Sequence, residues 1–156
     1  MCEYAGVEFS EAGAEISSTY EGRHITLLES QLTHPVHDDA LVDKGDPVQI
    51  GSSVDGALVG VAFKSALLNT DLIVVDTEGI WALSCVAENY SGNSAIAVGD
   101  RIYIGGTPGN NPAVGVGILS KDDLGVPFGN ALSTLTSGYT GLVAVKVHAG
   151  TAVAQP

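Results

Sequence analysis

Short apolar runs, separated by glycine, proline and charged residues, give this chain its pattern. Within residues 80–86, neighbouring side chains alternate with a period of two, which is the period of a β-strand. No stretch keeps the apolar spacing of a helix without a glycine or proline breaking it. Short strands with glycine-rich turns predict an all-β domain, a small β-barrel or sandwich. The runs expected to form strands are residues 25–28, 47–51, 57–63, 72–75, 80–86, 100–106, 113–119 and 140–150.

The connections between these runs carry their own predictions. Residues 72–75 are expected to pair with residues 80–86 as a hairpin, across a turn near residues 77–79. Residues 127–139 predict a long loop with room for one short turn of helix. Residues 93–100 fit either a single helical turn or a loop.

The N-terminal segment has a different texture from the rest of the chain. Residues 1–20 are polar with scattered apolar side chains, which predicts an extended or partly disordered N-terminal arm. Residues 21–156 are then expected to form a single β-domain. Apolar side chains on such an arm have little reason to exist unless a partner covers them. The expected partner-binding residues are Tyr4, Val7, Phe9, Ile16 and Tyr20.

A glycine–aspartate pair occurs twice, each time directly before an expected strand. The pairs are Gly45-Asp46 and Gly99-Asp100. Glycine permits a positive φ in a turn, and an aspartate side chain can accept a hydrogen bond from a nearby backbone N–H. Both pairs are therefore expected to be structural turns.

Composition and charge narrow the classes of partner. The chain has 156 residues, of which 45% are hydrophobic and 15% charged, below the roughly 25% charged residues of an ordinary soluble domain. With so little polar material, part of its surface is expected to be buried against other chains, although a well-packed monomer stays open. Eighteen acidic residues against six Lys and Arg give a net charge of −12. This balance argues against nucleic acid and against an anionic membrane surface, and leaves a basic partner possible.

The termini and the cysteines add little chemistry. Cys2 and Cys85 are the only cysteines, too few for a disulfide framework, and are expected to be reduced thiols of a protein made in the cytoplasm. The first residues show no signal-peptide pattern. No run reaches the roughly 18 apolar residues that would span a bilayer.

Residues 32–51 concentrate two histidines and four aspartates. A zinc site needs three or four ligands that converge on one point. Pro35 lies between His34 and His37 and favours an extended backbone, in which these two side chains would point to opposite faces. We therefore expect a solvated acidic segment that leads into a strand, and no metal.

Other reactive patterns are equally weak. Calcium bound by Asp38, Asp39 and Asp43 would match no known calcium-loop spacing. Residues 105–117 are rich in glycine but lack the Gly-Lys-Ser/Thr ending of a phosphate-binding loop. No serine or cysteine nucleophile signature is present. We expect neither an enzyme nor a bound cofactor.

Taken in order, six short segments form a family pattern within residues 42–148. They are Gly45-Asp46-Pro47-Val48, Val59-Gly60-Val61-Ala62, Val74-Val75-Asp76-Thr77-Glu78-Gly79-Ile80-Trp81, Val98-Gly99-Asp100-Arg101-Ile102-Tyr103, Phe128-Gly129-Asn130-Ala131-Leu132 and Val143-Ala144-Val145-Lys146-Val147. This order resembles the tailed-phage capsid cement, or head decoration, proteins, once grouped as a domain of unknown function. The acidic arm and the loop at residues 105–113 depart from that pattern.

The resemblance implies a structural protein of the virion. Such a β-domain would bind the outer surface of the icosahedral head and lock adjacent major capsid protein subunits together. It would be made in the host cytoplasm and would associate with itself, as a homotrimer at three-fold positions or alternatively as a homodimer at two-fold positions. The family brings no catalytic residues.

Two other functions stay open from the sequence. One is a carbohydrate- or receptor-binding β-module in which Trp81 and Tyr103 stack on the ligand. The other is a β-barrel enzyme that uses His34, His37 and Asp38.

Overall fold

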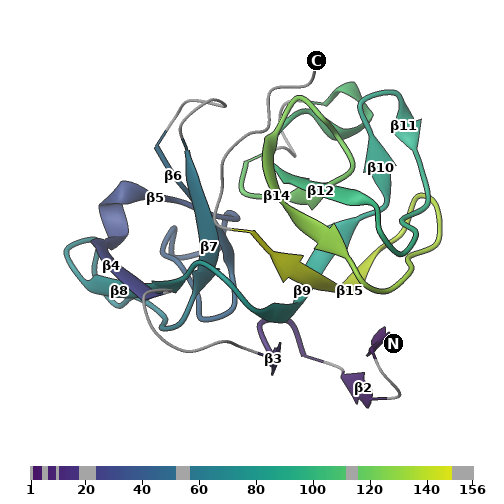
Figure 1. Cartoon of the computed structure of the whole chain (residues 1–156). Helices are drawn as coiled ribbons and strands as arrows, with labels where there is room; N and C mark the ends of the chain where they lie inside the picture. The colour runs from purple at the N-terminus through teal and green to yellow at the C-terminus, as the bar shows by residue number, and fades with distance from the viewer. Residues whose placement is uncertain are drawn as a thin grey trace.

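The fold is all-β, as the sequence pattern predicts (Figure 1). The structure, a computed structural model, describes residues 2–4, 7–9, 11–17, 24–51, 57–111 and 116–148; for residues 2–4, 7–9 and 15–17 it describes the backbone. The helical elements in these ranges are two three-residue 3₁₀ turns, η1 (Glu29–Gln31) and η2 (Pro108–Asn110). No helix of the described chain has the length and apolar character to cross a membrane.

The first half of the chain folds into a curled, antiparallel five-stranded sheet. Its strands, in spatial order, are β4 (His24–Leu28), β8 (Leu72–Asp76), β7 (Leu58–Ala62), β6 (Pro47–Ile50) and β5 (Leu32–Thr33). η1 joins β4 directly to β5, so the two edges of the sheet are neighbours along the chain. The sheet encloses a small apolar core made by Leu32, Val42, Val48, Ala62, Ala66, Ile73 and Val75.

The second half forms a closed barrel. Its order is β13 (Leu119–Ser120), β12 (Arg101–Ile104), β14 (Val126–Ala131), β15 (Thr140–Val147) and β9 (Ile80–Val86), and β3 (Glu15–Ser17) extends the sheet beyond β9. β13 also pairs in parallel with β9, through Leu119 and Cys85, and this pairing closes the ring. A closed ring leaves no unpaired edges within it, and its interior is filled by side chains.

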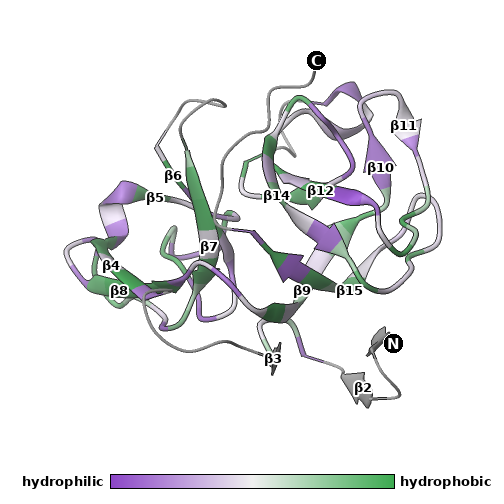
Figure 2. Ribbon diagram, in the orientation of Figure 1, coloured by the Kyte–Doolittle hydropathy of each residue, from purple (hydrophilic) through white to green (hydrophobic). Residues whose placement is uncertain are grey.

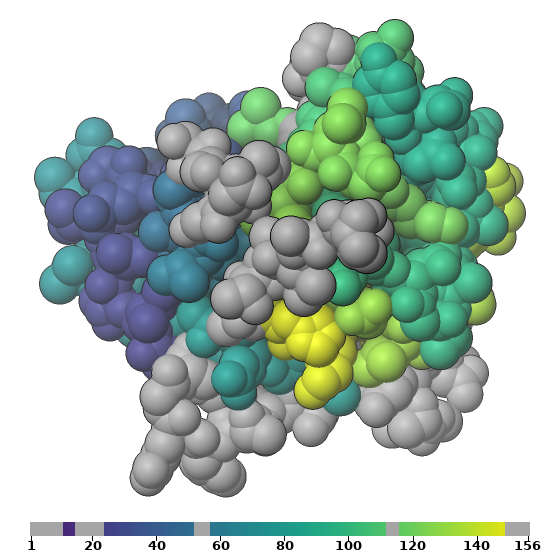
Figure 3. Space-filling view, turned by 45° about the horizontal axis from the view of Figure 1, so that its top comes forward, coloured from purple at the N-terminus to yellow at the C-terminus, as the bar shows by residue number. Residues whose placement is uncertain are grey.

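Strand β7 belongs to both cores. Val59 and Val61 lie in the core of the barrel, whereas Ala62 lies in the core of the five-stranded sheet. Both faces of the strand are thus buried, which is why it reads as a nearly continuous apolar run. A Cβ on Gly60 would lie 2.5 Å from Cγ1 of Val75, so glycine lets β7 and β8 approach closely. The two halves lie side by side in the space-filling view (Figure 3).

Part of the expected arm lies on the body of the same chain. β3 pairs with β9, the N–H of Gly13 donates to the carbonyl of Ala82 at 2.7 Å, and the N–H of Ala82 donates to the carbonyl of Ala14 at 2.9 Å. Before it, β1 (Cys2–Tyr4) and β2 (Val7–Phe9) pair with each other. The expected boundary near residue 20 lies outside the described residues and stays a prediction.

Two predicted connections are wrong. β8 pairs with β4 and β7, and β9 pairs with β15, β3 and β13, so no hairpin joins β8 to β9. Residues 77–79 instead carry the chain from one sheet to the other, with Gly79 at φ 99°. The predicted loop at residues 127–139 begins with strand β14.

The remaining predicted strands match the structure more closely, and the run at residues 113–119 is described only in part. Of the run at residues 113–119, the described part contributes Leu119 to β13, and residues 112–115 lie outside the description. Of residues 93–100, Asn93 ends a short strand and residues 94–100 form a loop that contains one isolated bridge, Ile96 to Leu135, before a turn. A further short ladder joins β10 (Glu88–Asn89) to β11 (Gly92–Asn93).

Candidate functional site

Four exposed leucines gather at one end of the five-stranded sheet. Leu28 and Leu72 are directly opposite each other in the β4–β8 ladder. Leu67 and Leu68 lie on the loop that leads into β8. The relative exposures are 38% for Leu28, 83% for Leu67, 62% for Leu68 and 60% for Leu72. We call these four residues the leucine patch, and Figure 2 shows the apolar colour on β4 and β8.

The loop that carries two of these leucines is held in place by hydrogen bonds. Oδ2 of Asp71 accepts the backbone N–H groups of Leu67 at 2.7 Å and Leu68 at 3.1 Å. These two bonds lower the pKa of the Asp71 carboxyl. The N–H of Glu29 donates to the carbonyl of Asp71 at 2.9 Å, which ties the loop to the end of β4. Exposed leucines concentrated at one end of a sheet favour a protein-binding site.

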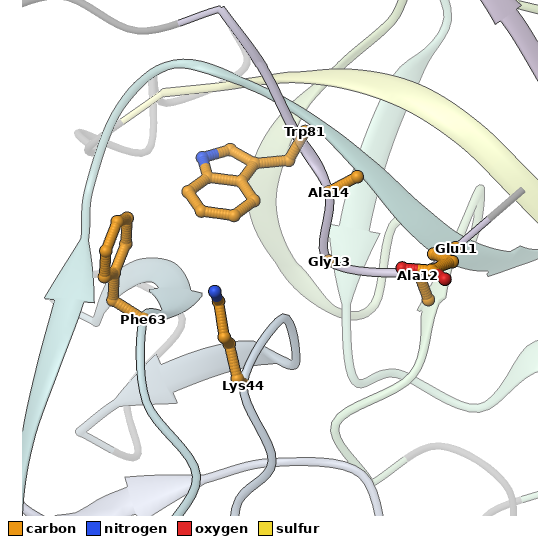
Figure 4. Close-up of a pocket in the computed structure, with 7 residues that line it drawn as sticks. All are labelled: Glu11, Ala12, Gly13, Ala14, Lys44, Phe63 and Trp81. Atoms are coloured by element: carbon orange, nitrogen blue, oxygen red, sulfur yellow. The ribbon is translucent and has the colours of Figure 1, made fainter. Parts of the chain in front are cut away.

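An aromatic pocket of about 350 Å³ lies where the N-terminal segment crosses the two sheets (Figure 4). Lys44 extends toward the space between the rings of Phe63 and Trp81, while Glu11 points away from them. The ammonium of Lys44 is 5.7 Å from the centroid of Phe63, within cation–π range. Phe63 meets Trp81 edge-on at 5.9 Å. The segment at residues 11–14 forms the opposite wall.

The structure does not bring Trp81 and Tyr103 into one ligand platform. Trp81 is 1% exposed, and its indole N–H donates to the carbonyl of Glu78 at 3.2 Å, so its ring has little open face for a sugar. Tyr103 is half-buried and lines a separate groove of about 490 Å³, together with Tyr90 and Arg101.

Two histidines and an aspartate meet in the connection between β5 and β6. The rings of His34 and His37 are stacked, with centroids 6.3 Å apart and an interplanar angle of 11°. Nε2 of His37 lies 2.6 Å from Oδ2 of Asp46. Nε2 of His34 lies 3.0 Å from Oε1 of Glu29, and its Nδ1 lies 2.7 Å from the carbonyl oxygen of Pro35. We call His34, His37 and Asp46 the histidine cluster.

The prediction that His34 and His37 point to opposite faces is wrong. After Pro35 the chain does not continue as a strand; the N–H of Ala40 donates to the carbonyl of His37 at 3.0 Å, and Ala40 has a φ of 57°. Residues 34–37 form no strand, so the side chains of His34 and His37 do not alternate, and the two rings lie beside each other. Asp38, which the enzyme hypothesis used, is exposed, and Asp46 approaches His37 in its place.

The charges around His37 favour its protonated form. Burial alone would lower the pKa of His37, but the hydrogen bond and charge of Asp46, with the charges of Asp43 and Asp39, outweigh burial and raise this pKa above 6.5. Burial also raises the pKa of the Asp46 carboxyl, against the hydrogen bonds from Asp43 and His37. Because imidazole is more basic than carboxylate by about 2.6 pKa units, we place the shared proton on His37.

The two glycine–aspartate pairs adopt the same turn. Gly45 has a φ of 92° and Gly99 a φ of 94°. In the first, Oδ2 of Asp46 accepts the N–H of Asp43 at 2.8 Å; in the second, Oδ2 of Asp100 accepts the N–H of Ala97 at 2.9 Å. In each case the aspartate N–H closes the turn by donating to the carbonyl three residues earlier.

The expected partner-binding residues belong to the N-terminal segment of the chain. Tyr4, Val7, Phe9 and Ile16 lie in β1, β2 and β3, whose backbone is described. Tyr20 lies outside the described residues. Their role in binding stays a prediction. The sequence did not predict the leucine patch, because the exposure of each leucine depends on how the strands pair and pack.

Comparison with known proteins leaves these sites to be interpreted from their own geometry. No protein-family model, no curated protein and no solved structure matches this chain.

Proposed function

We propose that this chain is a capsid decoration protein of a tailed phage, which binds the outer surface of the icosahedral head and stabilises contacts between major capsid protein subunits. The observation that carries the proposal is the leucine patch. Four leucines, each 38–83% exposed, lie on an ordered loop and two paired strands of a chain with only 15% charged residues. A surface of this kind favours burial against another protein.

The physical terms agree with such a role. Burying a leucine side chain contributes about 1.5–3 kcal/mol, before the costs of association are subtracted. When many copies bind one head, the free energy of each contact adds to the stability of the whole shell. The net charge of −12 suits the outer face of the head, away from packaged DNA, because it would be repelled by phosphates on the inner face.

The arm adds a second contact to this proposal. Residues 11–17 pair with β9 of the same chain, and β1 lies close to β15, so the arm would contact a neighbouring subunit while it stays on this body. Tyr4, Val7 and Phe9 are the expected contacts in that stretch. Self-association as a homotrimer, or alternatively a homodimer, is part of the proposal, and multi-angle light scattering of the purified chain measures it.

The test uses heads from particles that lack the chain, mixed with purified protein and sedimented. We expect the wild type to sediment with expanded heads and the double variant Leu67→Asp/Leu68→Asp to stay in the supernatant, because two charges would have to be buried without partners. Leu124→Asp is the matched control, since Leu124 is 57% exposed but lies on the other half of the molecule. Failure of the wild type to bind heads would refute the function. Equal binding by the leucine variant would refute the assignment of the patch.

A carbohydrate- or receptor-binding module is the second candidate, favoured by the groove that holds Tyr103. This groove of about 490 Å³ combines Tyr90 and Tyr103 with Arg101, a set of stacking and hydrogen-bonding groups suited to a glycan. Tyr103→Ala should abolish glycan-array binding. Deletion of residues 1–10 keeps β3 in place and discriminates the two functions, since it should weaken head binding and leave glycan binding unchanged.

A further inference from the structure

We propose that the histidine cluster binds one divalent transition-metal ion of the Zn²⁺ class, through His34, His37 and Asp46, and that this ion fastens the long connection between β5 and β6. The site is independent of the proposed function. Its three donor groups are an imidazole, an imidazole and a carboxylate, which is a common ligand set for zinc.

The geometry brings the donor atoms close to one point. One ligand atom from each of His34, His37 and Asp46 lies within 4.8 Å of the other two. An ion at about 2.0–2.2 Å from each ligand would place tetrahedral ligand pairs roughly 3.4 Å apart. The planes of the two rings are nearly parallel, inclined by 11°. Small side-chain rotations therefore suffice to complete the coordination.

The hydrogen-bonding capacity of the His34 ring does not match its two neighbours. Each ring nitrogen of His34 faces an oxygen atom that can accept a hydrogen bond. Nδ1 lies 2.7 Å from the carbonyl oxygen of Pro35, and Nε2 lies 3.0 Å from the carboxylate of Glu29. A neutral imidazole has one N–H and cannot satisfy both. A metal ion bound at one nitrogen of His34 would remove this conflict, because the other nitrogen then carries the single N–H. Nε2 of His37 lies against Asp46, the third proposed ligand.

The groups around the cluster match those that orient metal ligands. Whichever nitrogen of His34 binds the ion, the other keeps an acceptor, either the carbonyl of Pro35 or Glu29. Nδ1 of His37 lies 3.8 Å from Asp43. A histidine ligand that donates its other N–H to a carboxylate or a carbonyl has a fixed tautomer and a stronger donor atom.

The cluster is also partly shielded from water and rigidly framed. The side chains of His34, His37 and Asp46 are 10%, 31% and 13% exposed. His34 directly follows β5 and Asp46 directly precedes β6, and these strands pair with each other. A Cβ on Gly117 would collide with the backbone of His34, so a loop from the barrel fixes the first ligand from outside.

Ligand chemistry decides between metal classes. Mg²⁺ and Ca²⁺ prefer oxygen ligands, and six or more of them for Ca²⁺, so two imidazoles disfavour both. Imidazole suits Zn²⁺, Cu²⁺ and Ni²⁺. With three protein ligands, a fourth position would be left for water or for an oxygen of a neighbouring group.

The test is isothermal titration calorimetry of the full chain, stripped with EDTA, with ZnCl₂. We expect one Zn²⁺ per chain and no comparable binding of MgCl₂ or CaCl₂. Because loss of a partner of a metal ligand already costs about 10–100-fold in affinity, we expect His34→Ala and His37→Ala to cost at least about 100-fold. Zn²⁺ should also raise the Tm of the wild type and not that of His37→Ala, since an ion that binds only the folded state stabilises it.

His148→Ala is the matched control, because His148 lies outside the cluster, where its Nε2 meets Oδ1 of Asn130. It should bind Zn²⁺ as the wild type does. His37→Gln, which keeps a donor toward Asp46, replaces His37→Ala if the alanine variant fails to fold. Wild-type affinity equal to that of the His34→Ala/His37→Ala double variant would overturn the proposal, because it would mean that scattered surface carboxylates bind the ion. An equal loss of affinity in His148→Ala would overturn it as well.

Discussion

At the scale of single residues, the two glycine–aspartate turns share a backbone conformation but differ in their surroundings. A Cβ on Gly45 would collide with Cα of Gly13, whereas a Cβ on Gly99 would meet nothing within 4 Å. Gly99→Ala should therefore cost only the strain of a positive φ, about 1–2 kcal/mol. Gly45→Ala should cost clearly more, because it also lifts the N-terminal segment from the sheet. Urea unfolding of both variants measures the difference.

Gly13→Ala tests the same contact from its other side. Gly13 has a φ of 79° and would place its Cβ against Cα of Gly45. Its loss of stability should match that of Gly45→Ala and exceed that of Gly99→Ala. Equal losses for Gly45→Ala and Gly99→Ala would mean that residues 11–14 do not pack against this turn in solution.

Asp100 gives a prediction about pH. Its carboxylate lies 2.8 Å from Nζ of Lys121 and accepts the N–H of Ala97 at 2.9 Å. The bond to Lys121, followed by the bond from Ala97, lowers the pKa of Asp100 below its ordinary 3.8. A carboxyl with a lowered folded-state pKa stabilises the fold above its unfolded-state pKa, and this contribution disappears as the pH falls through the folded-state pKa.

We expect Asp100→Asn to be less stable than the wild type near neutral pH, by no more than about 1 kcal/mol, because the pair lies at the surface and is partly exposed. The gap should narrow as the pH falls below about 4, where the wild-type carboxyl is itself neutralised. Urea unfolding of both proteins at a series of pH values measures this difference in stability. A gap that stays constant down to the acid limit would contradict the role of the charge.

At the scale of elements, local patterns predict where strands are and fail on which strands pair. Residues 72–75 and 80–86 have the spacing of a hairpin, yet the first belongs to the five-stranded sheet and the second to the barrel. Their partners β4 and β15 are far away in the chain, so nothing local reveals the exchange. A strand can also be missed when it contains residue types that strands normally avoid, as β14 does.

Strand β14 was missed because Pro127, Gly129 and Asn130 interrupt its apolar run. The structure gives a reason for the glycine: a Cβ on Gly129 would collide with the carbonyl oxygen of Lys146 on β15. The histidine cluster was missed for a similar reason. Residues 34–37 form no strand, and Ala40, which follows them, has a positive φ that is uncommon for a residue other than glycine.

Gly60 allows a prediction about strand packing. Alanine is ordinarily preferred over glycine inside a regular element, but a Cβ here would lie 2.5 Å from Val75 and 2.6 Å from the carbonyl oxygen of Asp76. Gly60→Ala should therefore destabilise the fold by about 1–3 kcal/mol through overpacking. Gly141→Ala on β15 is the control, since its Cβ would meet the flexible end of Leu135 at 3.0 Å. Thermal unfolding of the two variants decides, and equal Tm values would argue against a tight β7–β8 contact.

At the scale of the whole molecule, the two cores meet in one strand. Val59 and Val61 of β7 lie in the barrel core, and Ala62 lies in the core of the five-stranded sheet. Unfolding of either half would therefore expose apolar side chains of the other. The sequence predicts a single β-domain from residue 21 onward, and a single domain is likewise expected to unfold in one cooperative transition.

Fluorescence of Trp81, the only tryptophan, reports the barrel and its junction with the sheet, whereas far-UV circular dichroism reports both halves. The two signals should follow one urea curve with one midpoint. Val61→Ala, which opens a cavity where the halves meet, should lower both midpoints together by an amount worth about 2 kcal/mol. If the sheet instead unfolded on its own, circular dichroism would show an early phase that Trp81 does not follow. The variant would then split the two transitions, because weakening the shared strand would release the halves from each other.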